Sequence, residues 1–165
     1  MNVVLTGFIG TGKTTIARLL AQKTGKSLVS TEEEISKKAK MSPGKFIEKN
    51  GMNKFYELEA EVVETISDFD DCIFDADYRI LMKNENVISF KKTSVIIMLT
   101  ADIKDVQERM KKKGSSWTKK SMNELEASIK DYESRCSKVA DYIIDSSRMS
   151  PEDACDLIAH YVQSE

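Results

Sequence analysis

Eight residues near the N-terminus have the types and spacing of a phosphate-binding loop, G-x-x-x-x-G-K-[ST]: Gly7-Phe8-Ile9-Gly10-Thr11-Gly12-Lys13-Thr14. Glycines permit a backbone that turns its N–H groups toward phosphate oxygens, in conformations where a Cβ would clash. The Lys13 ammonium would reach the β- and γ-phosphates of a nucleotide, and the Thr14 hydroxyl would bind Mg²⁺. The alternative is a plain glycine turn between a strand and a helix. The predicted nucleotide-binding residues of this loop are Gly7, Gly10, Thr11, Gly12, Lys13, Thr14 and Thr15.

A second candidate for chemistry is an apolar run that ends in an aspartate, Cys72-Ile73-Phe74-Asp75. This pattern is typical of a strand whose terminal carboxylate supports Mg²⁺ opposite the threonine of the phosphate loop. The stretch Asp75-Ala76-Asp77-Tyr78-Arg79 also looks like a degraded Asp-Gly-x-Pro-Arg segment of nucleoside monophosphate kinases. In that interpretation Arg79 meets a phosphate or carboxylate of the acceptor. The alternative is that Asp75 and Asp77 cap a short helix at 78–82.

The elements that must position these residues follow from an alternation of short β-branched runs with segments of helical period. We predict strands at 2–6, 27–30, 72–75, 94–99 and 141–144, and helices at 13–23, 32–38, 43–49, 52–66, 103–112, 122–137 and 151–162. The strands are apolar along their length, which is typical of parallel strands covered on both faces. The polar, lysine-rich stretch 111–120 is expected to form a mobile loop.

Composition limits the possible functions. The 165 residues are 41% hydrophobic and carry 25 basic and 27 acidic side chains. We therefore expect one domain, 1–165, with no cationic surplus for binding nucleic acid or an anionic membrane. No apolar run is long enough to span a bilayer and no signal peptide precedes the first strand, so a cytoplasmic monomer is expected. Three cysteines and one histidine make a disulfide framework, a zinc site or histidine-based triad chemistry poor hypotheses.

Motifs along nearly the whole chain follow the order of one known family. The opening VVLTGFIGTGKTTIARLLAQKTGKSLV is followed by TEEEISKKAKMSPGKFIEKNGMNKFYELEAEVVETI, and later by Val139-Ala140-Asp141, Asp145 and Ser150-Pro151. These segments resemble the phosphate loop, substrate-binding helices, last strand and last helix of the shikimate kinase family. The resemblance implies an α/β fold, the three-layer P-loop NTPase fold, with a five-stranded parallel sheet of order 2-3-1-4-5 flanked by helices and a lid loop.

The same resemblance implies ATP and Mg²⁺ as cofactors and phosphoryl transfer to a hydroxyl group. Arg109 and Pro151 match the positions that flank the adenine ring, and residues 111–121 match the lid. A guanidinium can stack on a heteroaromatic ring. Alternatively, Arg109 is a surface residue paired with Asp105, and Pro151 is a plain helix-start proline.

The sequence departs from the family's pattern on the acceptor side. Ser30-Thr31-Glu32 replaces Asp-Thr-Asp, Ala76-Asp77-Tyr78 replaces a triple glycine, and Tyr56 and Tyr132 stand where arginines are expected. Arg135 is displaced from the latter position by almost one turn. Each lost charge-assisted contact costs on the order of 1.5–3 kcal/mol, so shikimate should bind weakly. The predicted substrate residues are Glu32, Tyr56, Glu59, Arg79 and Tyr132.

Together these patterns predict an ATP- and Mg²⁺-dependent kinase that phosphorylates a hydroxyl group of a small-molecule acceptor. Lys13 would stabilise the transferred charge, Thr14 and Asp75 would hold the metal, and Glu32 would orient or deprotonate the acceptor hydroxyl. One alternative is a nucleoside monophosphate kinase-like enzyme, although five arginines are few for clamping two phosphorylated substrates. The other is a nucleotide-binding protein without catalysis.

Overall fold

The computed structural model describes residues 1–114 and 119–163. Five strands form one sheet in the order β2-β3-β1-β4-β5, in which every neighbouring pair is parallel. The strands are β1 (Asn2–Gly7), β2 (Ser27–Ser30), β3 (Cys72–Asp77), β4 (Ser94–Thr100) and β5 (Tyr142–Asp145). This order confirms the predicted topology, and all strands point their carboxyl ends toward the same edge.

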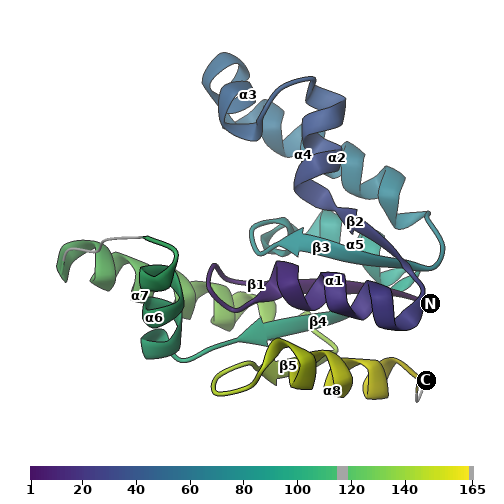
Figure 1. Cartoon of the computed structure of the whole chain (residues 1–165). Helices are drawn as coiled ribbons and strands as arrows, with labels where there is room; N and C mark the ends of the chain where they lie inside the picture. The colour runs from purple at the N-terminus through teal and green to yellow at the C-terminus, as the bar shows by residue number, and fades with distance from the viewer. Residues whose placement is uncertain (115–118, 164–165) are drawn as a thin grey trace.

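Helices cover both faces of the sheet (Figure 1). On one face α1 (Lys13–Thr24) and α8 (Pro151–Gln163) pack on alternate residues of the central strands, such as Val3 and Leu5 of β1. On the other face Val4 joins a second core with α4 (Met52–Ser67), α5 (Asn84–Lys91), α6 (Ile103–Lys112) and α7 (Lys119–Cys136). The alternation places successive strand residues in two separate cores, as a three-layer fold requires.

A helical lobe projects beyond the ends of β2 and β3 (Figure 1). It consists of α2 (Thr31–Ala39), α3 (Pro43–Asn50) and the first half of α4. Two serines begin these helices, since Ser30 accepts a hydrogen bond from the Glu33 N–H and Ser42 accepts one from the Lys45 N–H. These helices lie beyond the carboxyl edge of the sheet, and the first turn of α2 is next to the phosphate loop.

Helix α5 was not predicted. It follows the short 3-10 helix η1 (Ile80–Met82) and begins with two asparagines in three residues, Asn84 and Asn86. Asn86 is buried and points toward α4, where its side-chain amide donates to Glu59. A polar residue on the buried face interrupts the apolar period, which is why the pattern did not indicate a helix.

The polar stretch 111–120, predicted as a mobile loop, is partly helical. Helix α6 continues to Lys112 and α7 already begins at Lys119. Lysine is a good helix former, so the cationic composition is compatible with both helix ends. The central part of the predicted lid, residues 115–118, lies outside the described residues.

Within residues 1–114 and 119–163, no helix combines the length and the apolar character needed to cross a membrane. Cys72, Cys136 and Cys155 are buried free thiols.

Candidate active site

The loop between β1 and α1 has the backbone that phosphate binding requires. Gly10 has φ 83°, and a Cβ built on it would lie 2.9 Å from the Val106 side chain. A Cβ on Gly7 would lie 2.5 Å from the Thr11 hydroxyl, which donates to the carbonyl of Phe8 at 2.8 Å. Only glycine fits these two positions without displacing the loop. The cradle and the start of α1 behind it fit a bound phosphate group.

Arg109 braces this loop from α6. Its guanidinium donates to the carbonyl of Gly10 at 3.0 Å and to the carbonyl of Ser146 at 2.7 Å. The Ser146 hydroxyl in turn donates to the carbonyl of Thr11 at 2.9 Å. The predicted alternative, an ion pair between Arg109 and Asp105, is wrong. The Arg109 guanidinium bonds to backbone carbonyls, and the Asp105 carboxylate accepts from the backbone N–H of Arg148. The helix-start position of Pro151, directly after the β5–α8 loop, is confirmed.

At the first turn of α1, the Lys13 ammonium pairs with the Asp75 carboxylate at 2.5 Å. Asp75 lies at the carboxyl end of β3 and is 7% exposed. In the parallel register its partner on β2 is Ser30, the position where the family's pattern has an aspartate. The structure therefore places a carboxylate on the strand adjacent to the position that has lost one.

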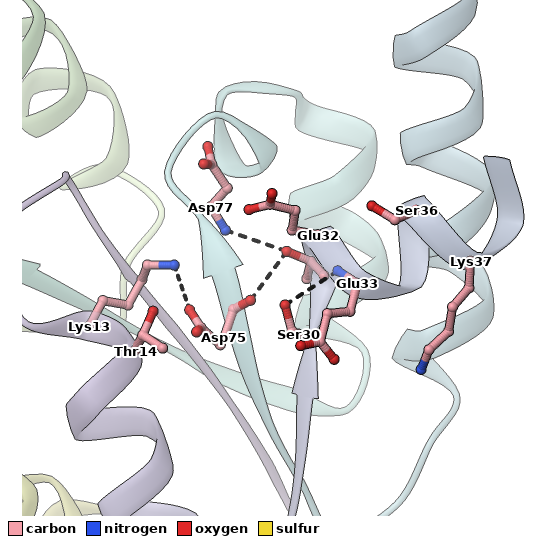
Figure 2. Close-up of a pocket in the computed structure, with 10 residues that line it drawn as sticks. Lys13, Thr14, Ser30, Glu32, Glu33, Ser36, Lys37, Asp75 and Asp77 are labelled. Carbon is pink, nitrogen blue, oxygen red and sulfur yellow. Dashed lines mark hydrogen bonds and ion pairs between the residues drawn. The ribbon is translucent and has the colours of Figure 1, made fainter. Parts of the chain in front are cut away.

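Thr31 fixes the backbone around Asp75. Its buried hydroxyl donates to the Asp75 carbonyl at 3.2 Å and accepts from the Asp77 N–H at 3.4 Å. A cavity of about 530 Å³ opens here, and Glu32 of α2 lines it opposite Lys13 and Asp75 (Figure 2). The structure thus brings the three predicted catalytic residues, Lys13, Glu32 and Asp75, to one cavity.

A neighbouring cavity of about 430 Å³ borders the phosphate loop. Thr14 lines both cavities, and Lys113 from the end of α6 lines the second one. The lining of this second cavity also includes Gly7, Gly10, Gly12, Lys13 and Thr15. Six of the seven predicted phosphate-loop residues, all except Thr11, therefore line this cavity together with Lys113 of the lysine-rich stretch 111–120.

Asp77 and Arg79 form the corner between the nucleotide side and the acceptor side. Asp77 accepts from the Arg79 backbone N–H at 2.9 Å and from its side-chain Nε at 3.0 Å. Asp77 therefore fixes the turn before η1, although η1 itself begins after Arg79 without a side-chain cap. The capping alternative does not describe Asp75 either, since its carboxylate pairs with Lys13. The ion pair with Asp77 raises the pKa of Arg79, which keeps the guanidinium charged.

Glu59 is a buried carboxyl group of α4 at the acceptor side. It is 4% exposed and accepts a hydrogen bond of 3.2 Å from the Asn86 side chain. Burial raises the pKa of Glu59 from 4.5 to about 7. The carboxyl group is therefore partly protonated at neutral pH.

This pKa predicts how stability depends on pH. Because the folded-state pKa lies above the unfolded-state value, the free energy of unfolding should fall as the pH rises from about 4.5 to about 7 and then level off. Glu59→Gln keeps an oxygen acceptor for Asn86 and removes the charge, so at pH 8 it should stabilise the protein by at most about 3 kcal/mol. At pH 4 the two proteins should be equally stable. Urea unfolding at both pH values measures the difference, with exposed Glu57→Gln on the same helix as the control. An equal effect of Glu59→Gln at both pH values would contradict the prediction.

Two tyrosines occupy the positions where the family's pattern has arginines, and their surroundings differ. Tyr56 is half-buried, and the Lys83 ammonium lies 3.7 Å from its ring centroid. Tyr132 is 1% exposed, and its ring packs 5.5 Å from Tyr78 and 6.1 Å from Phe8. The structure therefore brings Tyr56, Glu59 and Arg79 to one hollow and places Tyr132 in the core behind it.

Sequence reasoning missed Lys83, Asn86 and Ser146. Each acts through a partner that is distant along the chain: Tyr56, Glu59 and the phosphate loop, respectively. No local spacing signals such contacts. The burial of Asn86 could not be predicted either, because the sequence did not indicate the helix α5 to which Asn86 belongs.

Taken together, the parallel sheet, the phosphate loop and the lobe over its carboxyl edge define a small-molecule kinase of the P-loop class. A family model described as shikimate kinase matches residues 9–163. The shikimate kinase of Caldicellulosiruptor saccharolyticus is 34% identical over 159 residues, which cover 95% of this chain and 92% of that protein. The chain belongs to the shikimate kinase family, as the motifs predicted.

Solved structures agree on the fold. Shikimate kinase from Acinetobacter baumannii in complex with shikimate superposes with a TM-score of 0.85 at 21% identity, covering 99% of this chain and 93% of that one. Deoxyadenosine kinase from M. mycoides with bound dCTP gives a TM-score of 0.60 at 18% identity, covering all of both chains. The predicted class is confirmed: the chain is an ATP-dependent small-molecule kinase of the shikimate kinase type, a phosphotransferase with a hydroxyl acceptor.

Proposed function

We propose that the chain transfers the γ-phosphate of ATP, with Mg²⁺, to a hydroxyl group of a small acceptor held between the helical lobe and the phosphate loop. The observation that carries this proposal is the Lys13–Asp75 pair, which faces Glu32 across one cavity at the phosphate cradle. An ammonium, a metal-binding carboxylate and a candidate base are the groups that phosphoryl transfer needs at one point.

On the nucleotide side, the amides of the phosphate loop bind the phosphates. Arg109 and Pro151 flank the adenine, and residues 111–121 act as the lid. Thr14 and Asp75 hold Mg²⁺, which when bound neutralises charge on the phosphates. Lys13 changes partner from Asp75 to the transferred phosphate, so the pair seen in Figure 2 keeps both groups in place until nucleotide arrives. The buried position of Asp75 supports this role, because a buried carboxylate gains from a bound cation.

On the acceptor side, Glu32 orients the reacting hydroxyl and accepts its proton. Tyr56, Glu59 and Arg79 line the hollow where the rest of the acceptor lies. Tyr132 has a positioning role, since it supports Tyr78 next to Arg79. Shikimate, the ligand of the Acinetobacter relative, is our first candidate acceptor, held more weakly because arginines are absent at positions 56 and 132.

The proposal requires one copy of the chain and no nucleic acid or membrane. We place the reaction in the cytoplasm, where ATP is available and where buried free thiols such as Cys72, Cys136 and Cys155 remain reduced.

Acceptor-dependent release of ADP tests the proposal. With ATP and Mg²⁺, at least one member of a panel of shikimate, other hydroxylated metabolites, AMP and CMP should raise ADP release at least roughly tenfold above the rate without acceptor. Chelation of Mg²⁺ should abolish the stimulation. If ATP raises the melting temperature but no acceptor stimulates turnover, the chain binds nucleotide without catalysis. Stimulation by AMP or CMP alone would assign it to nucleoside monophosphate phosphorylation.

A further inference from the structure

Three cations meet in a hollow on the acceptor side, and none of them stands at a position where the family's pattern has an arginine. The hollow has a volume of about 200 Å³, and its charged lining consists of Arg79, Lys83, Arg135 and the carboxyl group of Glu59. The remaining lining is apolar or aromatic: Met52, Phe55, Tyr56 and Met82. This volume is below the roughly 300–1,000 Å³ of a pocket for a whole ligand, so the hollow fits one end of an acceptor.

The hollow connects to the reacting groups. A small intermediate hollow shares Phe55, Glu59 and Arg79 with it. The same intermediate hollow shares Thr31, Glu32 and Asp77 with the large cavity that contains Lys13 and Asp75. An acceptor lying along this path would place one end near the cations and a hydroxyl group near Glu32.

Lys83 differs from the other two cations in its partners. Arg79 pairs with Asp77 at 3.0 Å, and Arg135 pairs with Asp131 at 3.1 Å. Among the described side chains no carboxylate pairs with Lys83, and its ammonium lies 3.7 Å from the centroid of the Tyr56 ring. The carboxyl group near this half-buried ammonium is Glu59 in the same hollow, and because burial raises its pKa to about 7, it supplies only part of a counter-charge at neutral pH.

The backbone of Lys83 is held in place. Its N–H donates to the carbonyl of Ile80, and its own carbonyl accepts from the N–H groups of Asn86 and Val87 at the start of α5. The side chain therefore projects toward Tyr56 from a fixed position, which is a requirement for a specific binding group.

We infer that Lys83, seated on Tyr56, binds an anionic group of the acceptor, with Arg79 and Arg135 beside it. The inference rests on the proposed function and deepens it. Tyr56 stands where an arginine is expected, and in this chain it supports a cation supplied by the turn between η1 and α5. The acceptor is then a hydroxylated acid whose anion is a carboxylate or a phosphate.

Calorimetric titration in the presence of ADP tests this inference with two matched pairs of probes. Shikimate is compared with its methyl ester, and glycerol 3-phosphate with glycerol, so that each pair differs by an anionic group. The wild-type protein should bind at least one acid roughly tenfold more tightly than its neutral partner. The pair that shows this preference identifies the anion as carboxylate or phosphate.

Variants assign the preference to a residue. Lys83→Met should weaken binding of the preferred acid roughly tenfold and leave its neutral partner unchanged, while Lys83→Arg should retain most of the affinity. Lys92→Met, an exposed lysine at the end of α5, is the control with the same change in net charge. Equal binding of acids and neutral partners, no binding of any probe, or an unchanged affinity in Lys83→Met would overturn the inference.

A parallel assay of phosphoryl transfer separates this inference from the proposed function. If Lys83→Met loses acid binding and the wild type transfers no phosphate, the anion site stands and the kinase proposal fails. If the wild type phosphorylates acid and neutral probes alike, the kinase proposal stands and the anion site fails.

Discussion

Lys13→Ala is expected to lower kcat for phosphoryl transfer on the order of 10³-fold. The Lys13 ammonium lies at the first turn of α1, directly behind the phosphate cradle, and is the cation nearest to Asp75. Negative charge spreads over the transferred phosphoryl group in the transition state, and a fixed ammonium stabilises it more there than in the ground state. The KM for ATP should change less than kcat, because the amides of the loop remain.

The variant also leaves Asp75 without its partner, so folding must be checked separately. Lys23→Ala is a suitable control, since it removes a lysine from the other end of the same helix, where the ion pair with Asp156 is exposed. Circular dichroism and binding of ADP should show that the folded variant keeps its nucleotide site. Acceptor-dependent turnover near the wild-type rate in Lys13→Ala would contradict the proposed function.

The fold could be predicted from sequence because its signals are local. The phosphate loop occupies eight consecutive residues, and each strand is a short apolar run between helical segments. Predicted ends of the strands differ from the observed ends by at most two residues, as for β3, which continues to Asp77. Helix α5 was missed because its buried Asn86 serves a hydrogen bond to Glu59 rather than the apolar core.

The site could be predicted where each residue belongs to a recognisable motif of its own. Lys13 and Asp75 were each found from their own motifs, and the sheet register brings them together. The alternative ion pair of Arg109 with Asp105 is wrong, because in the structure Arg109 donates to two backbone carbonyls that lie far away in the sequence. Its place beside the adenine ring stays a prediction. The cation on Tyr56 depends in the same way on a contact between α4 and the start of α5, which no spacing indicates.

These contacts also explain how the family's acceptor side is altered in this chain. Replacing two arginines and a triple glycine by larger aromatic and acidic residues fills the space behind the phosphate loop with Phe8, Tyr78 and Tyr132. The Arg79 guanidinium lies at the edge of these rings, 5.9 Å from the centroid of the Tyr78 ring. The altered residues therefore form one connected change, in which the rings occupy the interior and the cations line the hollow.

Asp75→Asn should raise the Mg²⁺ concentration for half-maximal activity by roughly 10–100-fold. In the proposed mechanism the carboxylate at position 75 takes over the metal role that an aspartate at position 30 has in the family's pattern, and the direct pairing of Ser30 with Asp75 in the β2–β3 register supports this proposal. Asparagine keeps the size of the side chain and removes its charge. Asp71→Asn is the control, since Asp71 precedes the same strand at its other end and its side chain is exposed.

The register further predicts that the lost function can be restored from the adjacent strand. Ser30→Asp in the Asp75→Asn background should recover most of the Mg²⁺ affinity, because the carboxylate returns one strand away at the same level of the sheet. An aspartate at position 30 can still accept from the Glu33 N–H at the start of α2, so the helix start is preserved.

Ser30→Asp alone should be less active than the wild type, because two carboxylates would then face each other. The measurement is activity against Mg²⁺ concentration for the wild type, the two single variants and the double variant. If the double variant is no better than Asp75→Asn, then Asp75 acts only by positioning Lys13 and does not hold the metal.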